Sequence, residues 1–188
     1  YKKIEQSLCS IKAGNLKLIF FECVMANNNF ELLKQNLTKV SMVFCFDSTI
    51  SKRLIQNCII KYCYYFDTNQ PDQLVQIFTD DASIDYGPEV KTLKGHPEIL
   101  ATISHGLTHT FAATSHHVSN FMVEVTDSQS ATLICYLYAW HQYKETGNVG
   151  YLWGQYSLHL KRVRNHWKIC DLVLRGTATQ DFHRANMH

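Results

Sequence analysis

The chain has 188 residues, which is long enough for one well-buried domain and too short for two comfortable ones. Its 46% hydrophobic and 18% charged residues are typical of a folded globular protein and exclude a disordered chain. A net charge of +2 is too small to indicate nucleic acid or an anionic membrane as a partner.

Residues 1–46 are predicted to be an N-terminal extension. The apolar run over 16–26 is too short to span a bilayer, so no membrane partner is expected. Met25 is a candidate natural start, with 1–24 as an added extension. Apolar residues at helical spacing over 29–44 predict one short amphipathic helix in this region.

A domain over 47–176 is predicted to begin with a long helix. Asp47-Ser48-Thr49 supplies N-capping side chains ahead of it. Apolar residues then recur every four positions from Ile50 to Phe66, and the helix is expected to end at Asp67.

The remaining elements follow from turn residues and from changes in hydrophobic period. In chain order we expect a helix over 71–78, strands over 82–86 and 90–94, a helix over 95–107, and strands over 114–125, 131–143, 149–164 and 166–174. This order predicts an α+β fold, in which a cone-shaped, curved antiparallel sheet carries three helices and encloses an apolar pocket. Residues 177–188 are predicted to be a C-terminal tail.

Strand alternation sorts the candidate site residues into faces. On the strand over 114–125, His116 and Asn120 share one face and His117 lies on the other. On the next two strands His141 and Tyr156 lie on the small and aliphatic faces, which we expect to point inward. The opposite Tyr and Trp faces are expected to pack on a partner subunit.

The cysteines and histidines give no sign of a metal site. The seven cysteines are an odd number without a CxxC pair, which argues against zinc and against a disulfide framework. The ten histidines include no HExxH motif and no ligand spacing with carboxylates. We therefore expect reduced thiols, a cytoplasmic location and no metal.

An ordered set of short motifs resembles a known family. The motifs are Tyr64-Tyr65-Phe66-Asp67, Asp85-Tyr86-Gly87, Thr114-Ser115-His116-His117, Trp140-His141-Gln142-Tyr143, Gly154-Gln155-Tyr156 and His166-Trp167-Lys168-Ile169. Over about 48–174 this set resembles the SnoaL-like branch of the nuclear transport factor 2-like superfamily. Scytalone dehydratase and hexachlorocyclohexane dehydrochlorinase, two enzymes of similar pattern, eliminate a small group from a ring without a cofactor.

The resemblance implies roles for particular residues. Asp67 and His116 fall on the family's Asp–His pair, and His141 resembles the second histidine of the dehydratase. Tyr86 resembles a tyrosine that positions a water or the substrate carbonyl. Phe66 and Tyr156 stand where the dehydratase has a tyrosine and an asparagine, so the substrate contacts are expected to differ.

The residue types also support this chemistry directly. A neutral imidazole held by a carboxylate on its far nitrogen is a base suited to removing a proton next to a carbonyl. We expect Asp67 to hold His116 in this way, with Tyr86 or His141 bonding the developing enolate oxygen. Tyr86, Asn120 and Tyr156 are the candidate substrate-binding residues.

Two function classes follow from the sequence. The first is a cofactor-free lyase or isomerase acting on a small apolar cyclic or polyketide-like compound. The second is a non-catalytic ligand-binding or assembly subunit of the same fold, like the small subunit of a ring-hydroxylating dioxygenase. In either class a small apolar molecule is the expected ligand, and a homodimer or homotrimer is the expected assembly.

Overall fold

The computed structural model describes the backbone of residues 30–182 and the side chains of residues 49–182. The apolar run over 16–26 and Met25 lie outside the described residues. The chain divides into two compact units, Tyr1–Asp47 and Ser48–His188. The second unit carries the fold described below.

One uninterrupted helix, α3 (Phe30–Asp67), replaces the two helices predicted from the sequence. The predicted break at Asp47-Ser48-Thr49 is therefore wrong. Capping residues start a helix only where the preceding chain leaves the helical conformation, and no Gly or Pro interrupts 30–67.

The buried stripe of α3 also differs from the predicted one. Ile50 and Leu54 are exposed, whereas Ile55 and Ile59 are fully buried. A strict spacing of four residues drifts by about 40° per step around a helix of 3.6 residues per turn. The buried residues therefore differ from the predicted ones at the start of the stripe and coincide with them at Cys58, Tyr62 and Phe66.

The other elements follow α3 in the predicted order, with shifted ends. They are α4 (Pro71–Val75), β1 (Phe78–Asp85), β2 (Leu93–Lys94), α5 (Gly95–His105), a π-helical turn η1 (Gly106–Thr110), β3 (Phe111–Val125), β4 (Ser130–Tyr143), β5 (Val149–Val163) and β6 (His166–Gln180). Phe78 begins a strand and does not end the second helix as predicted. β6 continues past the predicted end at 174, so it overlaps the predicted tail.

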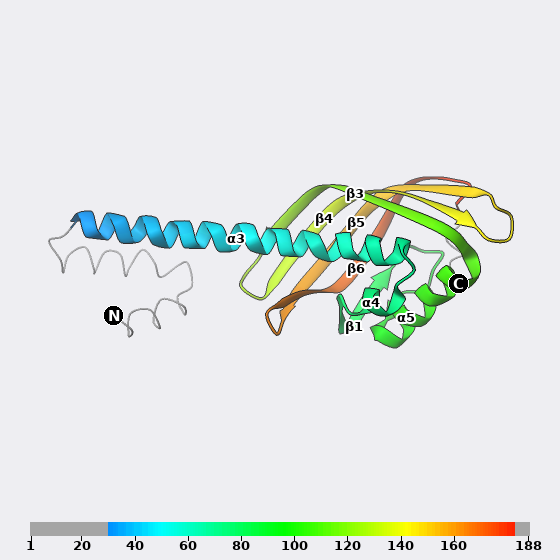
Figure 1. The fold of residues 1–188 in the computed structure, drawn as a ribbon, viewed down its shortest axis with the longest axis horizontal. Coiled ribbons are helices and arrows are strands. Elements are labelled where there is room, and N and C mark those ends of the chain that lie inside the picture. The colour runs from blue at the N-terminus through cyan, green and yellow to red at the C-terminus, as the bar shows by residue number, and fades with distance from the viewer. Residues whose placement is uncertain (1–29, 183–188) are drawn as a thin grey trace. The chain divides into compact units, whose positions relative to one another are not determined.

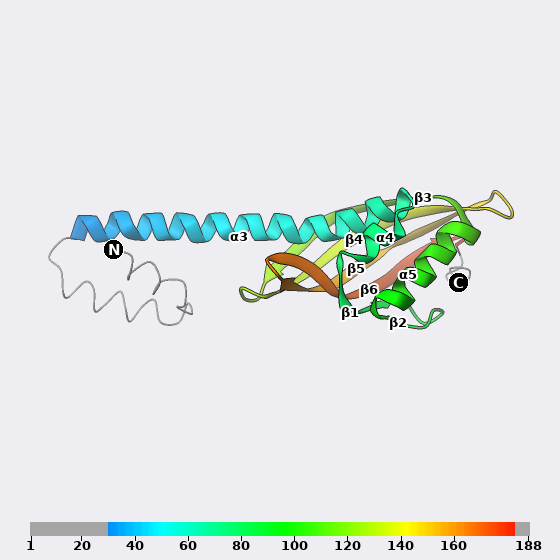
Figure 2. The ribbon, with the colours of Figure 1, turned by 60° about the horizontal axis from the view of Figure 1, so that its bottom comes forward.

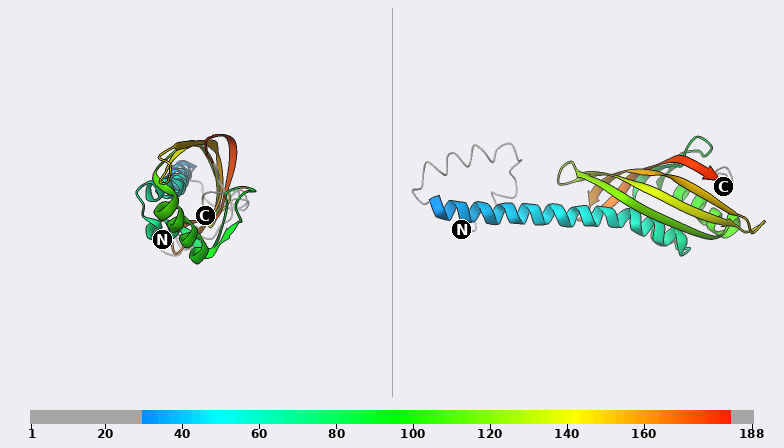
Figure 3. Two further views of the ribbon diagram at one scale, coloured as in Figure 1. Left: turned by 90° about the vertical axis from the view of Figure 1, so that its right-hand side faces the viewer. Right: turned by 90° about the horizontal axis from the view of Figure 1, so that it is seen from above.

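The six strands form one curved sheet in the order β2-β1-β6-β5-β4-β3. The sheet is mixed, because β1 pairs with β6 in parallel while the other neighbours are antiparallel. The predicted antiparallel pairing holds for every neighbouring pair of strands except β1 and β6. α4 and α5 lie on the same side of the sheet as the end of α3 (Figures 1 and 2). The end-on view in Figure 3 shows the strands as an arc around these helices. The result is a mixed α+β fold built on a curved, open six-stranded sheet.

The core lies between the inner face of the sheet and the helices. Alternation along β4 is regular: Leu133, Cys135 and Leu137 are buried, and Ile134 and Tyr136 between them are exposed. The predicted inward face of β4 is therefore confirmed. Within the described residues, no helix is long and apolar enough to cross a membrane.

A β-bulge interrupts the alternation of β3. The pairing with β4 shifts between Ser119 and Met122, and Asn120 has a φ of +54°. Asparagine tolerates this left-handed conformation better than most residues. Beyond the bulge Phe121 packs on the core, while Asn120 and Met122 are exposed. Asn120 does not share the buried face of His116, and its predicted place in the pocket is wrong.

Gly154 allows β5 and β6 to approach closely, and its replacement tests this contact. A Cβ atom there would lie 2.5 Å from the backbone oxygen of Arg175, which cannot move aside as a side-chain atom could. We expect Gly154→Ala to lower the free energy of unfolding by about 1–3 kcal/mol, measured by urea denaturation. Ser157→Ala on the same strand is the control and should change it little. Equal stability of Gly154→Ala and the wild type would contradict the close approach.

Candidate active site

The end of α3 and the middle of β3 meet at a carboxylate–imidazole pair. Asp67, the last residue of α3, accepts a hydrogen bond from Nδ1 of His116 at 2.6 Å. The backbone N–H of His116 donates to the other carboxylate oxygen at 2.8 Å, and the Thr114 hydroxyl donates to the first at 2.8 Å. Asp67 and His116, which are 49 residues apart in the sequence, are therefore in direct contact.

The hydrogen bonds to Asp67 fix its charge state. Burial by itself would raise the pKa of the carboxyl group, but the bonds from His116 and Thr114 favour the carboxylate and outweigh it. The net pKa of Asp67 lies below its ordinary value of 3.8. With Nδ1 of His116 donating to this carboxylate, Nε2 is the nitrogen that carries the lone pair.

His141 lies beside His116 in a buried, aromatic environment. The two imidazole rings have centroids 5.0 Å apart and meet edge to face at 88°. His141 is only 2% exposed, and its Nδ1 is buried without a hydrogen-bond partner. Burial lowers the pKa of His141 well below its usual value, so this imidazole is neutral at neutral pH.

A small cavity lies next to these groups. Its walls are Phe66, Tyr86, Thr102, Ile103, Gly106 and Phe111. The cavity leaves about 10 Å³ for the centres of water molecules, which is room for about one water. Phe66 contacts His116 at 4.9 Å, and Phe111 contacts His141 at 4.8 Å between ring centroids. These two phenylalanines join the histidine pair to the cavity.

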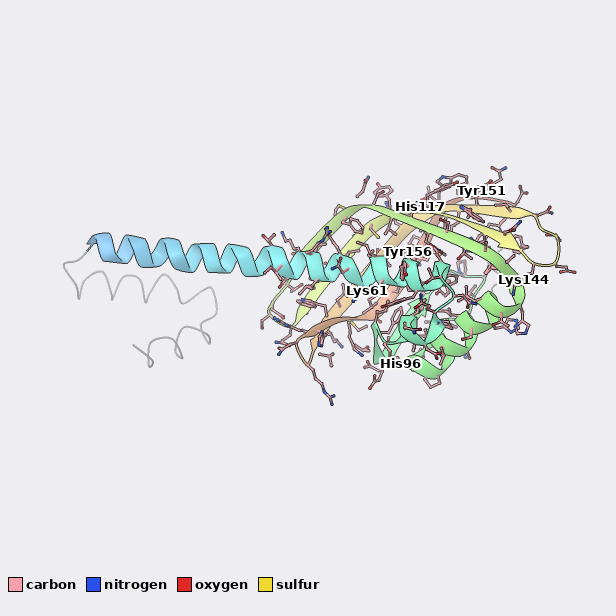
Figure 4. The ribbon with its side chains drawn as sticks, in the orientation of Figure 1. Lys61, His96, His117, Lys144, Tyr151 and Tyr156 are labelled. Carbon is pink, nitrogen blue, oxygen red and sulfur yellow. The ribbon has the colours of Figure 1, made fainter. Side chains whose placement is uncertain are left out.

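The tyrosines predicted from the sequence lie in different places. Tyr86 is 2% exposed and lines the cavity. Tyr156 is also buried, but it packs edge to face on Tyr62 and is not part of the cavity wall. Figure 4 shows His117 and Tyr151 on the side of the sheet away from α4 and α5. His117 is exposed, so its predicted outward direction is confirmed.

Sequence reasoning missed two aromatic residues of the site. Phe111 begins β3 before the predicted start of the strand, and Phe182 follows β6 inside the predicted tail. The ring of Phe182 stacks on His141 at 4.5 Å. Gly150 permits this contact, because a Cβ there would lie 2.9 Å from the Phe182 Cα. The isolated Phe182 carries no periodic signal that could have revealed its burial.

No metal site accompanies these residues in the part of the chain that the structure describes. Among the described side chains, from Thr49 to Phe182, no group of three or more His, Cys, Asp or Glu residues is arranged to hold a metal ion.

Comparison with known proteins places the fold in a family. A model of the SnoaL-like domain matches residues 48–173. The chain belongs to the SnoaL-like domain family. No curated protein sequence matches this SnoaL-like chain.

Solved structures with the same fold include dehydratase-type and dehydrochlorinase-type proteins. A scytalone dehydratase-like protein from Novosphingobium aromaticivorans is 29% identical, with a TM-score of 0.68, and the match covers 72% of this chain and 90% of that one. A hexachlorocyclohexane dehydrochlorinase from Novosphingobium barchaimii is 19% identical, with a TM-score of 0.66 and coverage of 72% and 92%. A nuclear transport factor 2-like protein from Salmonella enterica is 17% identical, with a TM-score of 0.63 and coverage of 70% and 94%. The last two show the fold alone.

The lowered pKa of Asp67 predicts how stability depends on pH. Because the folded-state pKa is lower than the unfolded value of 3.8, this carboxylate stabilises the fold above about pH 4. Its contribution is lost as the pH falls through the folded-state pKa. We expect Asp67→Asn to lower the free energy of unfolding at pH 6 by about 1–3 kcal/mol, with a smaller difference from the wild type at pH 3. Urea denaturation at the two pH values measures this.

The exposed carboxylate of Asp72 provides the matched control. In Asp72→Asn the free energy of unfolding should change between pH 6 and pH 3 by about as much as it does in the wild type. If the difference in unfolding free energy between Asp67→Asn and the wild type is the same at pH 6 and pH 3, the assigned charge state of Asp67 is contradicted.

Proposed function

We propose that this SnoaL-like protein is a cofactor-free lyase of the dehydratase type, or an isomerase, which acts through Asp67, His116 and His141. The observation that carries this proposal is the 2.6 Å contact between Asp67 and His116 beside a second, neutral histidine. The 29% identity to a scytalone dehydratase-like protein supports the same reaction class.

His116 is the proposed general base. Asp67 holds Nδ1–H and leaves the Nε2 lone pair to accept a proton from a carbon next to a substrate carbonyl. The carboxylate also stabilises the imidazolium that forms. In a dehydration the same imidazolium then gives its proton to the departing hydroxyl, which leaves as water as the C–O bond breaks. The base is restored, and the product carries a new double bond.

His141 and Tyr86 are the proposed partners of the developing enolate oxygen. His141 keeps one nitrogen without a protein partner, and a neutral imidazole can donate a hydrogen bond to an oxyanion. Burying an unpartnered polar nitrogen is costly unless a ligand satisfies it. Tyr86 offers a hydroxyl at the cavity wall. Donors fixed in a site with little water stabilise such a charge strongly.

The aromatic walls favour a small, mostly apolar substrate with a ring. Phe66, Phe111 and Phe182 surround the histidines with ring surface. The cavity holds only about one water, so a ring-sized substrate has to displace side chains of its wall. Such a site excludes bulk water around the proton transfers.

Replacement of His116 tests the reaction. We expect His116→Ala to lower turnover at least a hundredfold in a dehydration and isomerisation screen of cyclic carbonyl compounds, because the base is lost. His166→Ala removes an exposed histidine at the start of β6, outside the site, and should keep wild-type turnover. Equal turnover of His116→Ala and the wild type would remove His116 from the mechanism and favour a ligand-binding role.

An assembly of identical subunits is the second part of the proposal. The outer aromatic patch, defined as His117, Tyr136, Tyr138, Tyr151 and Trp153, covers the face of β3, β4 and β5 opposite the core. The ring of Tyr138 stacks with those of His117 and Tyr151 and meets that of Trp153 at a tilt, at centroid distances of 5.5–6.4 Å. Exposed apolar patches of this kind mark interaction sites.

The patch suits a second copy of the chain. The outward positions from 132 to 142 on β4 and from 151 to 157 on β5 carry no Asp, Glu, Lys or Arg. Two such faces can therefore pack without burying charge. We propose a homodimer or homotrimer through this patch.

A charge in the centre of the patch tests the assembly. Tyr138→Glu should reduce the molar mass measured by light scattering to that of one chain, because a buried unpaired carboxylate opposes association. Lys161→Glu changes an exposed residue of β5 outside the patch and should leave the mass unchanged. A wild-type mass of one chain would contradict the proposed assembly.

The cysteines support the proposed cytoplasmic location. Cys58, Cys63, Cys135 and Cys170 are free and buried. Burial raises the pKa of the Cys58 thiol to about 11, which keeps it protonated and unreactive.

A further inference from the structure

A pair of buried tyrosine hydroxyls lies at the edge of the cavity. The Oη atoms of Tyr62 on α3 and Tyr86 after β1 are 2.6 Å apart, which is a short hydrogen bond between neutral hydroxyls. Both side chains are at most 2% exposed. Tyr86 is part of the cavity wall, whereas Tyr62 is not. Tyr62 can therefore affect a ligand in the cavity only through Tyr86.

The ring of Tyr62 is held in place by three other aromatic rings. Phe78 and Tyr156 meet it edge to face, with centroids 6.1 Å and 5.9 Å away and interplanar angles of 81° and 77°. Phe66, one helical turn further along α3, meets it at 6.0 Å. Such contacts fix the ring plane and thus the position of its hydroxyl. A phenol held this firmly gives its partner a fixed hydrogen-bond direction.

The direction of the hydrogen bond decides what Tyr86 can do. A hydroxyl carries one proton, so the member of the pair that donates to its neighbour cannot donate that proton to a ligand. When Tyr62 donates, the proton of Tyr86 points away from Tyr62. Burial raises the pKa of Tyr86, and the hydrogen bond from Tyr62 acts in the opposite direction. Burial raises the pKa of Tyr62 as well, and this hydrogen bond raises it further, which is the pattern expected when Tyr62 donates and Tyr86 accepts.

We propose that Tyr62 is a positioning residue of the site, which donates to Tyr86 and directs the Tyr86 hydroxyl toward the oxygen of a ligand in the cavity. The catalytic part of this inference rests on the proposed function, in which Tyr86 donates a hydrogen bond to the enolate oxygen. The orientation of Tyr86 itself is a property of the protein without substrate. The two parts can therefore be tested separately.

A kinetic double-mutant cycle tests the catalytic consequence. Tyr62→Phe removes one hydroxyl and keeps the ring that packs on Phe78 and Tyr156. We expect it to lower kcat about tenfold and to change KM by less than about twofold, because the interaction matters most in the transition state. In a Tyr86→Phe background the same change should have no further effect on kcat, since Tyr62 acts through the Tyr86 hydroxyl.

Tyr64→Phe is the matched control, because it removes an exposed hydroxyl from the same helix. It should keep wild-type kcat and KM. A purely structural role for Tyr62 would lower the stability of Tyr62→Phe without changing the kcat of the folded enzyme, and this result would overturn the proposal. An equal loss of kcat in the Tyr86→Phe background would also overturn it. Tyr62→Met removes the same hydroxyl if Tyr62→Phe does not fold.

A second measurement separates this inference from the proposed function. In protein labelled with ¹³C at the tyrosine Cζ atoms, the Tyr86 signal is identified by its loss in Tyr86→Phe. It should shift in Tyr62→Phe and stay in place in Tyr64→Phe. If His116→Ala keeps full turnover while the Tyr86 signal shifts, the proposed function fails and the positioning of Tyr86 stands. An unchanged Tyr86 signal in Tyr62→Phe overturns the inference whatever the turnover.

Discussion

The carboxylate of Asp67 is the interaction on which the site depends. Three donors from β3 converge on it: the Thr114 hydroxyl, the His116 backbone N–H and the His116 imidazole. A negative charge at the C-terminal end of a helix is opposed by the helix dipole, and burial opposes it further. The three hydrogen bonds offset both costs. They also fix the end of α3 to the sheet and set the orientation and tautomer of His116.

The aromatic packing around this carboxylate gives the site its chemical environment. Phe66, Phe111 and Phe182 cover the two histidines and leave His141 neutral with one unpartnered nitrogen. In such surroundings a polar ligand atom gains more from a hydrogen bond than it would in water. This packing leaves a cavity of small volume. The size of a ligand that can bind therefore depends on how far the side chains of the cavity wall can move.

Much of the site could be predicted from local patterns. The inward direction of His116 and His141 follows from alternation on strands with one buried face, and the end of the long helix at Asp67 follows from its polar turn. Asn120 was misplaced because a bulge inserts an extra residue and reverses the faces beyond it. Asn120 has a φ of +54°, and a hydrophobic pattern carries no information about this backbone conformation. The continuous α3 was missed because capping residues are tolerated inside a helix when nothing forces the chain to leave it.

The sequence by itself determined the α+β class and the order of the elements, because periodicity and alternation are local properties of the chain. The pairing of Asp67 with His116 was expected from the resemblance of the ordered motifs to a known family. The tertiary structure decided the contacts between residues far apart in sequence. These include the parallel pairing of β1 with β6, the stacking of Phe182 on His141 and the hydroxyl pair of Tyr62 and Tyr86. Each depends on the angle at which two elements cross and on the space left by neighbouring side chains, and no short stretch of sequence encodes either.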